Sequence, residues 1–240
     1  MKRQRGVALL LVLWVLALLG TLLAGLVGWV HFQNRQALWQ RQHLQGQLAA
    51  EAGIALAVIA QLDRDPQRRW LADRQVHALR FADAELAVSL RSEQGQLDLN
   101  AAPAELIARL LQACGAAPAE ARQLAHAVEQ RRGEDQTPLR MVEELREIPG
   151  MTQALYLRAA PYVTLWSGLP SPDPRFAAPW LQRTLNLPRA PAAVTPAGSI
   201  ITLKSRATLP GGYTTTLRVT LLLNPSKEGA RPYRVLRWQE

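Results

Sequence analysis

Residues 1–20 read MKRQRGVALLLVLWVLALLG, and this stretch decides how the remainder of the chain is interpreted. Basic residues precede a single glycine, Gly6, and residues 7–30 then contain no charged side chain. A helix of this length is about 36 Å long, which is enough to cross a bilayer. The segment is longer than the apolar region of a secretory signal and lacks its small-x-small cleavage site. We therefore expect a membrane helix over residues 7–30, with the N-terminus in the cytoplasm and the remainder exported.

The helix is expected to continue beyond the membrane, because residues 31–62 contain no proline. Apolar residues recur there at three- and four-residue spacing, which is typical of an amphipathic helix with one apolar stripe. The stripe consists of Leu44, Leu48, Ala52, Ala55, Ile59 and Leu62. We expect its C-terminal part to pack against the chain's own sheet. We expect its N-terminal part, with Leu38, Trp39 and Leu44, to pack on helices of partner proteins.

The short basic leader, the glycine, the long apolar helix and its amphipathic continuation together resemble the N-terminal signal of type IV pilins and type II secretion pseudopilins. The resemblance implies that a prepilin peptidase removes residues 1–6 by cutting between Gly6 and Val7, and that it methylates the new amine of Val7. Gly6 suits such a cut, because a residue without a side chain lets an extended backbone enter a protease cleft.

Position 11 narrows the resemblance to one type of subunit. Most members of the family carry glutamate at the fifth mature position, where it pairs with a neighbouring subunit's amine, whereas this chain has Leu11. A carboxylate within the bilayer is costly unless it has a partner. A subunit that lacks this glutamate needs no partner above it, which resembles the K-type minor pseudopilin and implies a place at the tip.

The segments after the helix alternate between polar, strand-like and helical patterns. Residues 63–78 are expected to form a polar linker, and residues 79–99 a hairpin that turns at Gln94-Gly95. Four short helices are predicted over 100–160, the first capped by Asn100, the third opened by Thr137-Pro138 and the fourth capped by Thr152. Prolines over residues 168–198 predict a long loop. Antiparallel strands are predicted before and after Pro210-Gly211-Gly212 and at the C-terminus.

This layout predicts an α+β fold in which a pilin-like long N-terminal helix packs on an antiparallel sheet. An inserted four-helix domain resembles SAM-like and helix-hairpin-helix domains. The expected segments are the leader 1–6, the membrane half 7–30 and amphipathic half 31–62 of the helix, the first strands 79–99, the inserted helical domain 100–160, and the strand, proline-rich loop and C-terminal strands over 161–240. The layout resembles the K-type pseudopilin over nearly the whole chain, and the best local match besides the leader is ELREIPGM at 144–151.

The resemblance implies a non-enzymatic role in protein secretion. The chain is expected at the tip of a periplasmic pseudopilus, where it initiates assembly with other minor pseudopilins of the I and J types. Its expected location is the bacterial inner membrane, which it crosses once, with the C-terminal domain in the periplasm. Besides these subunits, the expected partners are the prepilin peptidase and the membrane itself.

A membrane-anchored DNA receptor of a DNA-uptake system is the alternative, since residues 144–151 also resemble a helix-hairpin-helix motif. Such motifs bind phosphate through backbone amides of a Pro-Gly-x-Gly turn, and the net charge of +9 favours anionic partners. Thr152 stands at the second glycine, however, so no nucleic-acid binding is expected.

Catalytic and metal-binding patterns are absent from the sequence. No Ser-His-Asp spacing, zinc-protease motif or phosphate-binding loop occurs, and Cys114 is the only cysteine. Glu134 and Asp135 stand where longer relatives carry an acidic loop, but two acids are too few for the six to eight ligands that calcium takes. We expect no enzyme activity, no cofactor and no metal.

Overall fold

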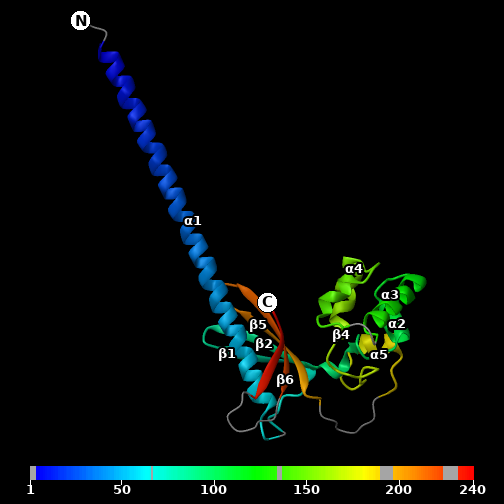
Figure 1. Cartoon of the computed structure of the whole chain (residues 1–240). Helices are drawn as coiled ribbons and strands as arrows, with labels where there is room; N and C mark the ends of the chain where they lie inside the picture. Colours follow the sequence, from blue (N-terminus) through cyan, green and yellow to red (C-terminus); the bar gives the residue numbers. More distant parts are fainter. Residues whose placement is uncertain (1–3, 66, 134–136, 190–196, 224–231) are drawn as a thin grey trace.

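The computed structural model describes residues 4–65, 67–133, 137–189, 197–223 and 232–240 (Figure 1). Its dominant feature is one helix, α1 (Gln4–Gln61), whose N-terminal half extends away from all other elements. The prediction that the helix continues without interruption over residues 31–62 is confirmed as far as Gln61. In the portion of the chain that is described, no helix has both the length and the hydropathy needed to cross a membrane.

Five antiparallel strands form the sheet against which the C-terminal part of α1 packs. They are β1 (Asp73–Phe81), β2 (Ala84–Ser92), β5 (Ile200–Thr208), β6 (Thr214–Leu223) and β7 (Tyr233–Gln239), in the order β1-β2-β5-β6-β7. Alternation places Leu86, Val88 and Leu90 on the buried face. The predicted α+β class, with a long N-terminal helix on an antiparallel sheet, is thus confirmed.

The buried face of α1 differs from the predicted stripe. Leu44, Leu48 and Ile59 are 56%, 54% and 68% exposed, respectively. The residues that face the sheet lie on the opposite side of the helix, and most of them are glycine or alanine, with Ile54 and Val58 the larger ones. They are Gly46, Ala49, Ala50, Gly53, Ile54, Ala57 and Val58. Small side chains are favoured at this contact because they let the helix approach the sheet closely. A Cβ on Gly46, for example, would lie 3.0 Å from Cγ2 of Thr215.

The first hairpin also differs from the prediction. β1 begins inside the expected linker, and it pairs with β2 through a two-residue turn between Phe81 and Ala84. Ala82 has a φ of 49° in this turn, a conformation usually taken by glycine or asparagine. The turn therefore carries no sequence signal. Gln94-Gly95 lies instead in a short 3₁₀ helix, η1 (Glu93–Gly95).

A second core lies in the helical insert. Its elements are α2 (Ala104–Ala113), α3 (Pro118–Arg131), the 3₁₀ helix η2 (Val142–Glu147), α4 (Gln153–Ala159) and the short helix η3 (Ala160–Tyr162). The third predicted helix is therefore 3₁₀ and begins five residues after Thr137, because the Glu144 carboxylate accepts hydrogen bonds from the amides of Arg140 and Met141. Thr152 caps α4 as predicted, through a bond from the amide of Leu155 (3.2 Å).

Asn100 does not cap α2, whose N-cap residue is Pro103. Its amide side chain instead binds the backbone of Leu139, in a loop that is distant in the sequence. Nδ2 donates to the Leu139 carbonyl (2.9 Å), and Oδ1 accepts from the Leu139 amide (3.1 Å). This pairing joins segments 39 residues apart, so no local pattern predicts it.

The insert connects to the sheet through a small parallel pair, β3 (Leu97–Asp98) with β4 (Val163–Thr164). The proline-rich segment is not entirely loop, because it contains α5 (Pro179–Leu185). Pro179 stands at the first helical position, where its missing N–H costs nothing, and Leu181 and Leu185 are buried in the helical core. Arg237 of β7 forms an ion pair with Glu143 of η2 and ties the two parts together.

Candidate partner-binding surface

An apolar ridge runs along the side of α1 that faces away from the sheet. We define the α1 ridge as the four exposed residues Leu44, Leu48, Ala55 and Ile59. They are spaced by four, seven and four residues, so they lie on one side of the helix. Removing such side chains from water is worth roughly 25 cal/mol per Å² of apolar area. Exposed apolar side chains gathered on one side of a helix commonly mark a protein-binding site.

The three predicted partner-binding residues do not share one face of α1. Leu44 belongs to the α1 ridge, whereas Trp39 lies toward the β5–β6 turn. Its ring stacks on His43 with centroids 5.1 Å apart, and Nδ1 of His43 lies 2.8 Å from the Tyr213 hydroxyl. Leu38 is exposed on a third side of the helix. All three side chains are nevertheless accessible to a partner.

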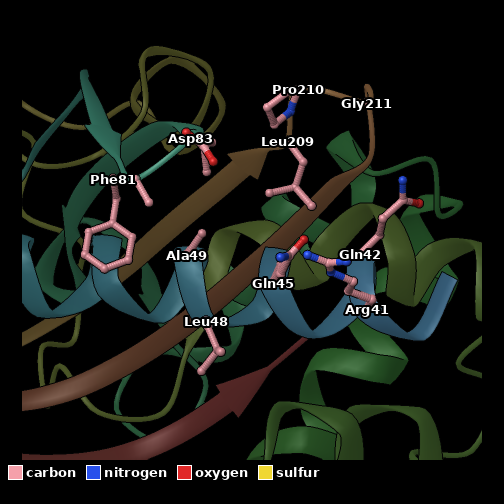
Figure 2. Close-up of a pocket in the computed structure, with 12 residues that line it drawn as sticks. Arg41, Gln42, Gln45, Leu48, Ala49, Phe81, Asp83, Leu209, Pro210 and Gly211 are labelled. Atoms are coloured by element: carbon pink, nitrogen blue, oxygen red, sulfur yellow. The ribbon is translucent and has the colours of Figure 1, made fainter. Parts of the chain in front are cut away.

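A pocket of about 430 Å³ adjoins the ridge, between α1, the β1–β2 turn and the β5–β6 turn (Figure 2). Ala49, Leu209 and Pro210 contribute apolar surface. Arg41 and Gln45 of α1 add polar groups, as the close-up shows. Leu48 belongs to both the ridge and the pocket lining. Sequence reasoning missed the pocket, because its walls come from three segments that only the fold brings together.

The predicted processing site lies at the start of α1. Gly6 and Val7 fall within the first two turns of the helix. Cleavage between them and methylation of Val7 stay predictions.

The turn that resembles a helix-hairpin-helix motif serves the packing of the insert. Gly150 has a φ of 93°, and a Cβ there would lie 3.5 Å from Cδ2 of Leu124 in α3. The amide of Met151 already donates to the Ile148 carbonyl (3.0 Å), and the Thr152 hydroxyl caps α4. These groups are engaged within the protein, which weakens the case for phosphate binding.

Residues with catalytic or metal-binding chemistry do not gather in the described part of the chain. Cys114 is buried, and burial raises the pKa of its thiol, which keeps it protonated. Among the described residues, no three His, Cys, Asp or Glu side chains form a group that could hold a metal. Glu134 and Asp135 lie outside the described residues.

Comparisons with known proteins match the family resemblance seen in the sequence. The chain is similar to type II secretion system protein K of Klebsiella pneumoniae, with 29% identity over a 204-residue alignment that covers 67% of this chain and 62% of the relative. It is equally similar, at 29% identity over 204 residues, to a putative type II secretion system protein K of Escherichia coli K12 (68% and 62% covered). No protein-family model matches the chain.

The fold is similar to a chain in the crystal structure of the GspK-GspI-GspJ complex from the type 2 secretion system of enterotoxigenic E. coli. The TM-score is 0.58 at 15% identity, covering 86% of this chain and 98% of that one. The alignments span 62% of the length of the curated relatives. The resemblance to the K-type minor pseudopilins is confirmed in both sequence and fold.

Proposed function

We propose that this chain, a K-type minor pseudopilin by its resemblance in sequence and fold, works at the tip of a periplasmic pseudopilus and initiates its assembly in type II secretion. The observation that carries the proposal is the match to two curated relatives named type II secretion system protein K. The long N-terminal helix on an antiparallel sheet supports it, since this architecture is shared with the solved secretion complex.

The proposed partners are the I- and J-type minor pseudopilins, because the solved structure with the similar fold is a complex of GspK with GspI and GspJ. The α1 ridge offers these partners apolar anchors at helical spacing, as helix-in-groove recognition requires. The adjoining pocket at Leu48 offers a cavity for a projecting side chain. Leu38 and Trp39 lie on other sides of α1, and we propose them as separate contact residues nearer the membrane.

The tip position follows from the N-terminal helix and from the shape of the head. Leu11 replaces the membrane-buried glutamate of most family members, so the helix has no charge with which to pair a subunit above it. The helical insert stands beside the sheet and widens the head (Figure 1). A wide head without a pairing charge favours a subunit that nothing follows.

The location proposed is the inner membrane, with residues 7–30 as the single anchor and the sheet and insert in the periplasm. Prepilin peptidase would remove residues 1–6 and methylate Val7. Lys2, Arg3 and Arg5 support this orientation, because basic residues before the apolar segment retain the N-terminus in the cytoplasm.

Copurification tests the assembly role. The full chain is coexpressed with the I- and J-type subunits of its own organism, extracted in mild detergent and recovered by a C-terminal tag. We expect both partners to copurify with the unchanged chain, and Leu44→Asp to remove at least one, because a charge on the ridge must be desolvated on binding.

Leu71→Asp is the matched control, since Leu71 is a similarly exposed leucine outside α1. It should leave both partners bound. The proposal is wrong in this form if Leu44→Asp retains every partner, or if the purified chain alone polymerises into filaments.

A further inference from the structure

Basic side chains gather on the face of the sheet that is turned away from α1. Ser205 faces α1, because a Cβ on Gly53 would lie 3.3 Å from its Cβ. Its strand neighbour Lys204 therefore points to the opposite face. Arg218 of β6 is the register partner of Lys204. Like charges directly opposite each other destabilise a sheet, so this pair costs stability unless an anion compensates it.

A small pocket on this face is lined by basic residues. Its volume is about 150 Å³, and its charged lining residues are Arg74, Arg91, Lys204 and Arg218. Arg91 and Arg218 also line an adjacent cavity of about 220 Å³. The far wall of that cavity belongs to the helical insert and is apolar, with Leu157, Pro161 and Trp166. We call these two spaces, which share Arg91 and Arg218 in their linings, the basic cleft.

The cleft holds more positive charge than the protein itself neutralises. Arg91 lies 3.4 Å from the carboxylate of Glu93, which is only 1% exposed and also accepts a hydrogen bond from the Thr202 hydroxyl (2.6 Å). Arg74 donates to neutral acceptors. Within the described residues, Lys204 and Arg218 form no ion pair.

Burial, together with neighbouring positive charge, lowers the pKa of two of these arginines. Desolvation and the charge of Arg91 lower the pKa of Arg74. Desolvation and the charges of Arg91 and Arg237 lower the pKa of Arg218, although part of its side chain is exposed. An anion bound between them would relieve this repulsion. Local conflicts of this kind are expected at functional sites rather than in purely structural ones.

We propose that the basic cleft binds an acidic peptide segment of a partner protein. Aspartate or glutamate side chains would lie between Lys204, Arg218 and Arg74, and an aliphatic or aromatic side chain would lie against Leu157 and Trp166. The concave shape favours this occupant, because a planar bilayer or a DNA duplex would meet only the rim of a cavity this small. The proposal is independent of the pseudopilin role.

Fluorescence anisotropy tests the proposal with the full chain in detergent micelles. The probe is a short fluorescein-labelled peptide of alternating glutamate and leucine, titrated at low and near-physiological salt. We expect saturable binding that weakens with salt, and no binding of the same peptide with glutamine in place of glutamate. Arg218→Gln and, separately, Lys204→Gln should each weaken binding about tenfold, the loss typical of a charge-assisted hydrogen bond.

Arg206→Gln is the matched control. Arg206 is exposed on the same strand and face as Lys204 but lines neither cavity. It should leave the affinity within about twofold, because its exposed side chain lines neither cavity and its charge acts on a bound group only through water and salt. Equal losses for Arg206→Gln and Arg218→Gln would overturn the proposal, as would equal binding of the glutamine peptide. Binding of phosphatidylglycerol vesicles or duplex DNA, but not of the acidic peptide, would overturn it too.

Discussion

Ser205 on β5 lies so close to Gly53 on α1 that any Cβ at position 53 would overlap the serine hydroxyl. The same Cβ would lie 3.2 Å from Cγ2 of Val88 on the neighbouring strand. The contact between helix and sheet at this point therefore depends on the absence of a side chain. Gly46 makes a second close approach two turns earlier, against Thr215 and Tyr213.

Gly53→Val is expected to lower the free energy of unfolding by about 1–3 kcal/mol, because overpacking forces the helix and the sheet apart. Denaturant unfolding of the full chain, followed by circular dichroism, measures the effect. Ala55→Val, two residues away on the exposed side of α1, should change stability by less than about 0.7 kcal/mol, the cost of a β-branched residue in a helix. Similar losses in the two variants would refute close packing at Gly53.

Asn100→Ala should lower the free energy of unfolding by about 1–3 kcal/mol, since it leaves the buried backbone groups of Leu139 without partners. Asn100→Asp retains the acceptor for the Leu139 amide but loses the donor to its carbonyl, so an intermediate loss is expected. Thermal unfolding of the three proteins compares them. An unchanged midpoint for Asn100→Ala would show that the clamp contributes nothing.

The ion pair between Asp173 and Arg175, in the proline-rich segment before α5, should make the folded protein less stable at low pH. A hydrogen bond from the Arg175 side chain lowers the pKa of the Asp173 carboxyl, and the Arg175 amide also donates to it (2.9 Å). The unfolded chain, with an ordinary pKa of about 3.9, binds the proton more readily. The stabilisation is therefore complete above that value and is lost as the pH falls through the lower folded pKa.

Unfolding measured from neutral pH down to pH values below that range should show a smaller acid-induced loss in Asp173→Asn than in the unchanged protein. Asp83→Asn, at the exposed β1–β2 turn, is the control. If the pH profile of Asp173→Asn matches that of the unchanged protein, the Asp173–Arg175 pair does not govern acid stability.

Duplex DNA should not bind with useful affinity at near-physiological salt. The turn at Gly150 is engaged in packing, and nonspecific phosphate contacts weaken steeply as salt rises. Titration of labelled duplex with the full chain measures this directly. Sub-micromolar binding that is abolished by Gly150→Ala, in a variant that stays folded, would instead favour the DNA-receptor alternative.

Cleavage after Gly6 is expected in cells that contain a prepilin peptidase. The mature chain should begin at a methylated Val7, as measured by mass spectrometry of the purified protein. Gly6→Leu should leave the precursor uncut, because a bulky side chain hinders entry of the backbone into the protease. An intact N-terminus in the unchanged protein would contradict the pilin-type signal.

Sequence periodicity alone determined the long helix and the C-terminal strands. The absence of proline from residues 31–62 and the alternation over 200–208 are local properties, and each favours one regular structure by itself. The Thr152 cap was predictable for the same reason, since its hydroxyl bonds an amide three residues away. The family resemblance of the leader and of residues 144–151 could also be recognised from the sequence alone.

Tertiary structure decided which side of each element is used. The spacing of Leu44, Leu48 and Ile59 marked an apolar stripe, but the sheet selected the glycine and alanine side of α1, because close approach of backbones buries more surface than large side chains held apart. The partner of Asn100 and the convergence of Arg74, Arg91, Lys204 and Arg218 depend on segments far apart in the chain. No local sequence pattern predicts such contacts, because the segments that form them come together only in the folded state.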